Sequence, residues 1–264
     1  MQTRKVRNLA SVFLISYASI AFSAQPHWDH SEQSTWWAIE DTSQEIPLRY
    51  PFAECGVGKH QSPIDLAAAN MNNTKSLNNL AVSYPTDVSS FFNSGHGVQV
   101  NTSVGYTGAL KIGEESFPLI QYHFHEPSEH VVDGKKFPAE LHFVHINDDG
   151  RIIVLAAAMD VGEANATFQT ILDNMPSQEG EQNADSGIQL DPASLLPELD
   201  HQNLGFYTFA GSLTTPPCSE GVQWYLLPET ITISASQLEQ LKGFYSNNSR
   251  LPQQVNGRAI LSTQ

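Results

Sequence analysis

The sequence predicts a mainly β (α+β) fold built as a single domain. Short runs rich in valine, isoleucine, phenylalanine and tyrosine recur between turn signals, which is the pattern of β-strands. Helical periodicity is weaker and is confined to two segments. The 264 residues contain no internal repeat and no Pro/Ser-rich linker. We therefore expect one domain over residues 24–264, after an N-terminal segment 1–23.

The expected elements follow one another along this domain. The predicted strands cover residues 98–104, 119–125, 139–146, 152–159 and 221–227. Helices are predicted over 164–174 and 236–245, and Ser234 or Ser236 is a candidate N-cap for the second helix. Residues 70–79 and 176–187 are rich in asparagine, glycine or proline and are predicted to form surface loops.

The segment 1–23 has the pattern of a secretory signal peptide. Arg4, Lys5 and Arg7 precede a mostly apolar stretch, and Ala21-Phe22-Ser23 is a small-x-small cleavage signal. A membrane anchor is the alternative, but the apolar stretch is shorter than the roughly 20 residues of a spanning helix and contains several polar residues. We expect cleavage before Ala24 or Gln25, a periplasmic or secreted location, and no membrane contact after cleavage.

The chain is strongly acidic. Its net charge of −15 becomes about −18 without residues 1–23, because that segment holds three basic and no acidic residues. Such a charge argues against nucleic acid or an anionic membrane as a partner. It gives no information about a reaction.

Two histidines separated by one residue lie in the strand predicted over 119–125. These are His123 and His125, and His142 lies in the strand predicted over 139–146. Alternate side chains of a strand share a face, so a third histidine on a neighbouring strand could complete a three-nitrogen metal site. Three neutral imidazoles suit Zn²⁺ and leave its fourth position open to water. On spacing alone, core or surface histidines without a metal remain an alternative.

Two polar residues lie where they could orient these imidazoles. Gln121 shares a strand face with His123, and Glu140 shares one with His142. A metal-binding histidine usually donates its second N–H to such an acceptor. Either residue could instead be an ordinary polar strand residue, although burying a carboxylate without a partner is costly.

Several segments together resemble the α-class carbonic anhydrases, in particular the secreted bacterial type. In the family's order they are 61–65 (QSPID), 93–96 (NSGH), 121–125 (QYHFH), 128–130 (SEH), 139–145 (AELHFVH) and 212–217 (SLTTPP). The resemblance covers nearly the whole chain after residue 26. It implies a large, twisted, mostly antiparallel central β-sheet with short peripheral helices. It also implies an enzyme that interconverts carbon dioxide and bicarbonate.

The resemblance implies a Zn²⁺ cofactor held by His123, His125 and His142. It further implies that Thr214 orients the zinc hydroxide and that Glu129 orients Thr214. With its proton committed to an ionised Glu129, the Thr214 hydroxyl can only accept a hydrogen bond from the hydroxide, which aims the hydroxide at the substrate.

A further histidine, His96, matches the family's proton shuttle. An imidazole with an ordinary pKa near 6.5 is suited to carry the released proton to buffer, and a solvated loop histidine is the alternative. His30 stands where the family commonly has a tyrosine, so we expect either a different water network or a shifted alignment. His130 and His145 resemble buried structural histidines of the family and are not assigned to the metal site.

The family's apolar substrate wall is matched by a set of residues that any β-core could also contain. They are Val144, Val154, Leu213 and Trp224, with Thr215 beside them.

The two cysteines, Cys55 and Cys218, lie outside any C-x-x-C spacing. In an oxidising compartment an even pair predicts a disulfide, and many secreted bacterial members of the family use these positions for one. A zinc-binding role for the cysteines is the competing interpretation.

Three functions are compatible with the sequence. The first is a carbonic anhydrase acting on carbon dioxide and bicarbonate, the second a carbonic-anhydrase-like binding or structural protein without turnover, and the third a zinc esterase. Binding relatives typically lose a zinc histidine, whereas all three are present here together with Thr214 and Glu129. The family includes monomers and dimers, so a homodimer is one of the open states.

Overall fold

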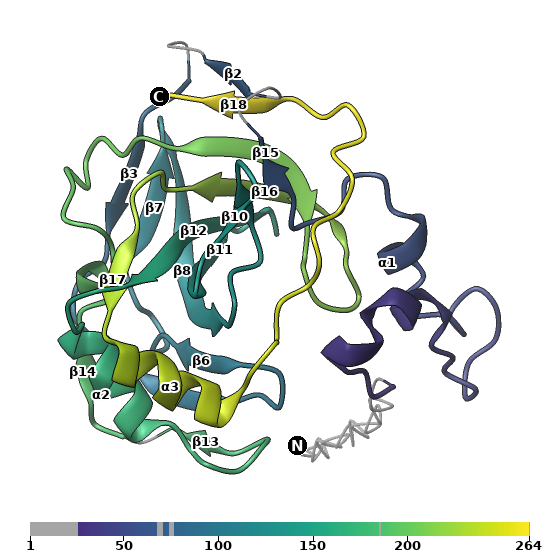
Figure 1. The fold of residues 1–264 in the computed structure, drawn as a ribbon, viewed down its shortest axis with the longest axis horizontal. Coiled ribbons are helices and arrows are strands. Elements are labelled where there is room, and N and C mark those ends of the chain that lie inside the picture. The colour runs from purple at the N-terminus through teal and green to yellow at the C-terminus, as the bar shows by residue number, and fades with distance from the viewer. Residues whose placement is uncertain (1–25, 68–70, 74–76, 185, 264) are drawn as a thin grey trace, which may run out of the picture.

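The computed structural model describes residues 26–67, 71–73, 77–184 and 186–263 (Figure 1). The signal peptide predicted for residues 1–23 lies outside the described residues. The mainly β prediction is confirmed: one large mixed sheet runs through the molecule, with short helices at its periphery. Among the described residues, no helix is long and apolar enough to cross a membrane.

The strands of the central sheet are mostly antiparallel. In spatial order the main path contains β13 (Gln182–Asn183), β5 (Ser90–Asn93), β6 (Val98–Asn101), β8 (Glu115–His125), β11 (Ala139–Ile146), β12 (Ile152–Val161), β16 (Glu220–Leu226), β15 (Tyr207–Ser212), β18 (Ile260–Ser262) and β2 (Met71–Asn73). In addition, β17 (Ile231–Ile233) pairs with β12, and β7 (Ala109–Ile112) pairs with both β8 and β3 (Leu80–Ser83). The parallel pairs are β12–β16, β12–β17 and β18–β2.

The remaining elements are short. One small sheet contains β1 (Asp65–Leu66), β9 (Val131–Val132) and β10 (Lys135–Lys136), and another contains β4 (Asp87–Val88) and β14 (Gln189–Leu190). The helices are the 3₁₀-helices η1 (His30–Ala38) and η3 (Pro192–Leu195) and the α-helices α1 (Glu54–Val57), α2 (Ala166–Asn174) and α3 (Ala235–Phe244).

Capping side chains set where the two longer α-helices begin. The Asn165 side chain accepts from the Phe168 N–H, so α2 starts at Ala166. Of the two serines predicted to cap the second helix, Ser234 does so, in a reciprocal capping box with Gln237.

Two loop predictions and several strand boundaries were wrong in part; β8 begins at Glu115 and β12 ends at Val161, outside the predicted ranges. The predicted loops 70–79 and 176–187 contain β2 and β13, which lie at opposite ends of the sheet and gain their structure from pairing with β18 and β5. The strand predicted over 98–104 ends at Asn101 because a turn follows, closed by the Tyr106 N–H donating to the Ser103 carbonyl. Local sequence carries little information about such tertiary pairing.

The two faces of the central sheet bury different side chains. On β8, Tyr122 and Phe124 enter a large apolar core that also receives Phe168 of α2 and Leu241 of α3. A smaller apolar cluster forms around Trp224 of β16 and includes Val154 of β12 and Phe209 of β15. The histidines of β8 alternate with the core residues and therefore point toward the opposite face.

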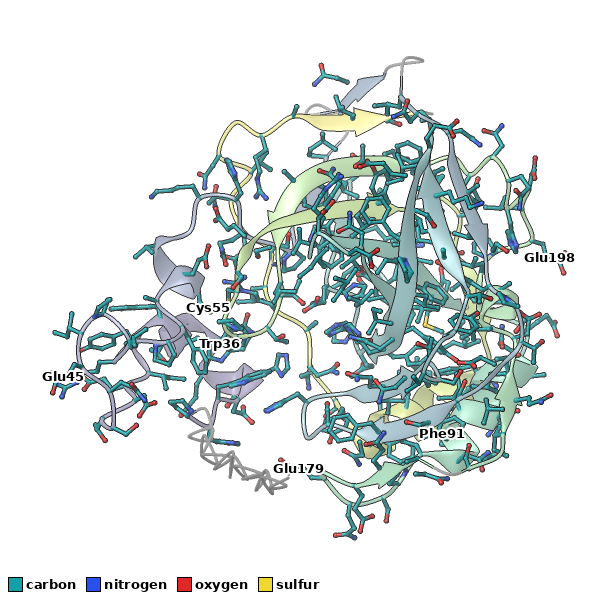
Figure 2. The ribbon with its side chains drawn as sticks, turned by 180° about the vertical axis from the view of Figure 1, so that it is seen from behind. Trp36, Glu45, Cys55, Phe91, Glu179 and Glu198 are labelled. Atoms are coloured by element: carbon teal, nitrogen blue, oxygen red, sulfur yellow. A yellow bond between two sulfur atoms is a disulfide. The ribbon has the colours of Figure 1, made fainter. Side chains whose placement is uncertain are left out.

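The N-terminal segment, with η1 and α1, lies beside the sheet (Figure 1). Trp36 is buried, and its indole N–H donates to the Asp29 carbonyl over 2.7 Å. The predicted disulfide is present and joins Cys55 of α1 to Cys218, 163 residues away. Figure 2 labels Trp36 and Cys55 in this segment. The disulfide therefore ties the segment to the loop that follows β15.

Candidate metal centre

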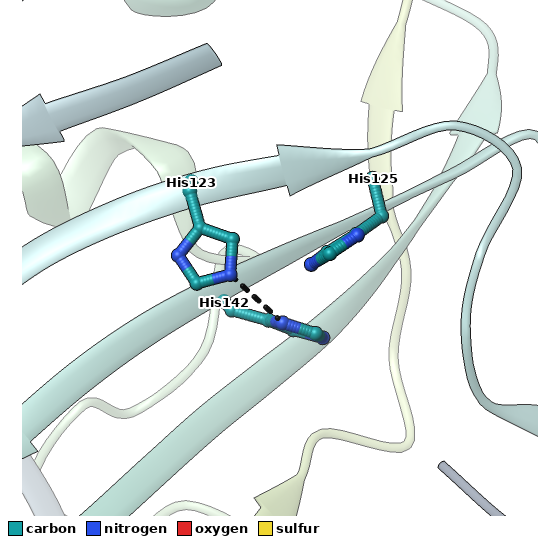
Figure 3. A group of neighbouring side chains, drawn as sticks. All are labelled: His123, His125 and His142. Carbon is teal, nitrogen blue, oxygen red and sulfur yellow. Dashed lines mark hydrogen bonds between the residues drawn. The ribbon is translucent and has the colours of Figure 1, made fainter. Parts of the chain in front are cut away.

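Strand register brings the three predicted metal ligands together. On adjacent antiparallel strands, His142 of β11 is directly opposite His123 of β8, and Glu140 is opposite His125. The i and i+2 positions of β8 share a face, so three imidazoles converge (Figure 3). One ligand nitrogen from each lies within 4.8 Å of the other two.

The partner of each imidazole determines which nitrogen is free for a metal. His123 Nδ1 donates to the Gln121 side-chain oxygen over 2.8 Å, and His125 Nδ1 donates to the backbone carbonyl of Asn248 over 2.9 Å. His142 Nε2 donates to Glu140 over 2.8 Å. Oxygen acceptors fix the protons on these nitrogens, so the lone pairs of His123 Nε2, His125 Nε2 and His142 Nδ1 are free.

The free nitrogens fit a tetrahedral metal ion. His123 Nε2 and His142 Nδ1 are 3.3 Å apart, the pair joined by the dashed line in Figure 3. Two lone pairs at that distance repel each other, whereas two ligands of a tetrahedral zinc at 2.0–2.1 Å are separated by about 3.3 Å. His125 Nε2 is buried and has no hydrogen-bond partner among the described residues, which is also what a metal ligand requires.

Burial favours the neutral form of His123 and His142. It lowers the pKa of His123 well below the usual value, and the neighbouring His125 and His142 lower it further. It also lowers the pKa of His142, against the opposing effect of Glu140. A neutral imidazole is the form that binds metal, so no proton has to be removed at neutral pH.

Glu140 is buried and accepts four hydrogen bonds. Oε2 accepts the backbone N–H groups of Glu129 and His130 at 2.8 Å each, while Oε1 accepts His130 Nδ1 at 2.6 Å and His142 Nε2 at 2.8 Å. Burial alone would raise the pKa of Glu140, but His130 and His142 lower it well below the usual value. The carboxylate is therefore charged and fixes the orientation of His142.

The two histidines predicted to be structural occupy buried positions outside the metal triad. His130 Nδ1 donates to Glu140 Oε1. His130, Glu140 and His142 are close enough together to hold a metal ion, but they are joined by hydrogen bonds instead. His145 donates from Nδ1 to the Ile153 carbonyl, and its Nε2 accepts from the Tyr84 hydroxyl over 2.7 Å. Burial lowers the pKa of His145 to about 3. Both of its nitrogens are thus occupied within the core.

Thr214 and Glu129 lie buried beside the histidines. Glu129 Oε1 accepts the backbone N–H of Arg250 at 2.8 Å, and Oε2 lies 3.5 Å from His125 Nε2. Burial would raise the pKa of Glu129, but His125, His142, the Arg250 N–H and the Thr214 hydroxyl together lower it. Oε2 nevertheless has no hydrogen bond of ordinary length within the described part of the chain, so this oxygen is still available as an acceptor.

The predicted apolar wall is contiguous. Val154 of β12 is in register with Trp224 of β16, and both are buried in the smaller apolar cluster. Val144 and Leu213 pack against the same cluster. The Trp224 indole lies 4.9 Å from the His142 ring, centroid to centroid, so this wall borders the metal centre. Thr215 lines a cavity of about 230 Å³ together with His123 and His125.

His96 also lines this cavity, on the β5–β6 connection. Its ring stacks on Trp28 with centroids 3.7 Å apart. A second, larger cavity of about 580 Å³ also reaches His96 and is lined by Asp29, His30 and Tyr245. His96 therefore lies between the space beside the metal ligands and a larger polar cavity.

His30 packs next to His96. Its ring centroid is 6.2 Å from that of His96 and 5.2 Å from that of Trp28. Its Nε2 is buried and has no hydrogen-bond partner in the part of the chain that the structure describes. Burial, followed by the charge of His125, lowers its pKa to about 4. At neutral pH, His30 is therefore a neutral imidazole.

Sequence reasoning missed two residues near the C-terminus. The Asn248 carbonyl holds His125, and the Asn248 amide donates to the backbone carbonyls of His96 and Phe124. The buried Arg250 guanidinium donates to Gln61 Oε1 and to the Ser62 and Cys55 carbonyls. The metal-facing contacts are made by backbone atoms, which leave no side-chain signature. In the sequence, the one available signal for this region was an arginine at the end of a polar run.

Comparisons with known proteins agree with this geometry. The family model described as eukaryotic-type carbonic anhydrase matches residues 47–264. A carbonic anhydrase of Pectobacterium carotovorum is 37% identical over 248 residues, which cover 92% of this chain and 95% of the relative.

Solved structures of similar proteins share the fold. The α-carbonic anhydrase of Thermovibrio ammonificans, in complex with the inhibitor sulfanilamide, is 38% identical with a TM-score of 0.74, covering 80% of this chain and 90% of that one. Dioscorin complexed with ascorbate is 27% identical with a TM-score of 0.72, covering 84% and 97%. The chain therefore belongs to the eukaryotic-type, or α-class, carbonic anhydrases, a family of lyases.

Proposed function

We propose that the protein is a zinc-dependent carbonic anhydrase that reversibly hydrates carbon dioxide to bicarbonate and a proton. The observation that carries this proposal is the 3.3 Å separation of the free nitrogens of His123 and His142, beside the unpartnered Nε2 of His125. Zn²⁺ bound there would lower the pKa of a water ligand to near 7, a value established for this family, and so supply a strong nucleophile at neutral pH.

Thr214 orients the attacking oxygen. Because the pKa of Glu129 is lowered, its carboxylate is ionised and can only accept a hydrogen bond. The Thr214 hydroxyl donates a hydrogen bond to that carboxylate, so its oxygen is left to accept one from the nucleophile. The lone pair of the nucleophile is thereby directed at the substrate carbon.

The apolar wall holds the substrate. Carbon dioxide is small and carries no charge, so contact with Val144, Val154 and Leu213 beside the metal is favourable, while a charged pocket would bind water instead. Bicarbonate is less well solvated at such a wall than in water, which favours its release.

His96 carries the released proton away from the centre. It lines the same cavity as His123 and His125 and also reaches the larger polar cavity. Burial lowers the pKa of His96. The imidazole is only half buried, however, and it lines both cavities. Proton exit and hydration are therefore assigned to different residues.

The site of action is proposed to be periplasmic or extracellular. The disulfide between Cys55 and Cys218 is stable in an oxidising compartment, and residues 1–23 have the pattern of a cleaved signal.

Removal and return of the metal tests the proposal. Chelation should remove about one zinc per chain and abolish carbon dioxide hydration, and added Zn²⁺ should restore both. Ester hydrolysis, assayed on the same samples, should be much slower than hydration. A metal-free preparation with full hydration activity would contradict the proposal. Zinc-loaded protein without hydration would instead favour a binding protein, and faster ester hydrolysis would favour an esterase.

A further inference from the structure

The loop that follows α2 is fastened to the turn that carries His96. The Asn93 N–H donates to the Glu181 carbonyl over 3.0 Å, and the Asn93 side chain donates to the Pro176 carbonyl over 3.0 Å. The Gly180 N–H donates to the Asn93 carbonyl over 2.8 Å. Three hydrogen bonds thus fix this loop against the start of the β5–β6 turn.

This attachment places an acidic side chain against that turn. A Cβ built on Gly95 would lie 2.4 Å from Glu179 Oε1 and 2.7 Å from its carboxyl carbon. Gly95 also has a φ of 81°, a backbone conformation that favours glycine, and a side chain at this position would displace the neighbouring carboxylate. Figure 2 labels Glu179 at the edge of the molecule. The carboxylate therefore lies against the residue that precedes the candidate proton shuttle, His96.

The negative charge of Glu179 is not neutralised by a neighbouring lysine or arginine in the described part of the chain, so it can act on the His96 imidazole. Glu179 is exposed and forms no ion pair with a lysine or arginine among the described residues. The charged or titratable groups that surround His96 come from several elements: His27, Asp29, His30, Lys136, Glu179 and Tyr245.

These groups act on His96 in opposite directions. Burial is the largest effect and lowers the pKa of His96. Glu179 opposes it most strongly, His27 adds to the lowering, and Asp29 opposes it weakly. Stacking on Trp28 partly shields the ring, so without a nearby negative charge the imidazole would be a poor proton acceptor.

We propose that Glu179 is a positioning residue for proton exit: its carboxylate, held against Gly95, places a negative charge beside the turn that carries His96 and so favours transfer of the released proton to that imidazole. A proton acceptor works best when its basicity matches that of the donor, and the donor in this family loses its proton near pH 7. Glu179 itself touches neither substrate nor metal ligands. This inference rests on the proposed function for its purpose, but the effect on His96 stands on its own.

The test uses Glu179→Gln in the zinc-loaded protein, with Glu181→Gln as the matched control. Both residues are exposed acids on the same loop, and the Glu181 side chain is not among the groups that act on His96. Proton NMR of the His96 ring should show its titration moving to lower pH in Glu179→Gln only. The shift should nearly vanish in 1 M salt, where the Debye length is about 3 Å.

Kinetics give the second measurement. In dilute buffer, kcat for hydration should fall by roughly twofold in Glu179→Gln, with its pH midpoint moved to lower pH, while kcat/KM stays the same. An unmoved His96 titration, or equal shifts in both variants, would overturn the proposal. If hydration itself were absent, the NMR shift would still be expected, so a failure of the proposed function can be told from a failure of this inference.

Discussion

The metal centre and the proton-exit side of the site are built in contrasting ways. The three histidines lie on two adjacent strands, and each has one nitrogen fixed by an oxygen acceptor. His96 lies on a turn, stacks on Trp28 of the N-terminal segment, and is bordered by two cavities. A sheet holds the groups that must not move, while segments far apart in sequence hold the group that exchanges protons with solvent.

This difference predicts separable failures. Damage to the strand-borne centre should remove metal and chemistry together, because the ligands and their acceptors form one hydrogen-bonded unit. Damage to the exit side should change rates and pH dependence while the metal stays bound.

The largest effect is expected from His142→Ala. It removes one ligand nitrogen and leaves Glu140 without one of its donors, so zinc content should fall to a small fraction and hydration should fall more than about a hundredfold. Metal analysis and stopped-flow hydration on the same sample measure both. His60→Ala, which changes an exposed histidine, is the control. Retained zinc and activity would end the assignment of the centre.

Loss of the disulfide should lower the free energy of unfolding, because the bond ties the N-terminal segment beside His96 to the rest of the protein. The double variant Cys55→Ser, Cys218→Ser should lose about 2–5 kcal/mol of unfolding free energy in urea, because the bond closes a long loop. Reducing agent should reproduce the loss in the unaltered protein and change nothing in the variant. Equal urea midpoints would show that the N-terminal segment is held by other contacts.

Glu140→Gln tests the centre without removing a ligand. The amide is similar in shape, but it replaces one acceptor oxygen with a donor in a site that receives four N–H groups. Zinc affinity should weaken about 10- to 100-fold in competition with a chelator. Glu163→Gln, at an exposed position, should leave affinity unchanged. Unchanged zinc affinity in Glu140→Gln would mean that the Glu140 carboxylate is not needed to orient the His142 imidazole.

His30→Tyr tests the acid sensitivity of the exit side. Burial lowers the pKa of His30 to about 4 in the folded state, so below its ordinary value the unfolded chain binds more protons. Its contribution to stability is therefore complete above pH 6.5 and is lost as pH falls toward 4. Between pH 7 and 5 the variant should lose about 1–2 kcal/mol less unfolding free energy than the unaltered protein. Parallel losses would contradict this account.

The smallest effect is expected from His96→Ala. In dilute buffer kcat should fall by roughly five- to tenfold while kcat/KM is unchanged, because only proton exit is lost. Added imidazole should restore much of the rate, and zinc content should match that of the unaltered protein. Equal decreases in kcat and kcat/KM without rescue would place His96 in the structure or in the chemical step.

The same contrast explains what could be predicted from the sequence. His123, His125 and Glu140 follow from strand alternation, which is a local pattern. The register that places His142 opposite His123 could only be inferred from resemblance.

The exit side left almost no local signal. The stacking of Trp28 on His96 and the approach of Glu179 to Gly95 join segments far apart in the chain. Likewise, β2 and β13 were missed because pairing at a sheet edge gave them their structure. Backbone donors and acceptors, such as the Asn248 carbonyl, are supplied by every residue type and so cannot be found by composition.

The position of Asn248 and Arg250 near the end of the chain has a consequence for biosynthesis. His125 lies 123 residues before its acceptor, and the Arg250 guanidinium reaches back 189 residues to Gln61. A nascent chain that has emerged only as far as β17 already carries every histidine of the centre, yet none of this bracing. The backbone acceptor that orients His125 is therefore supplied only after residue 248 has been synthesised. A chain that stops before Asn248 would still contain the partners of His123 and His142, namely Gln121 and Glu140, but His125 would lack its acceptor.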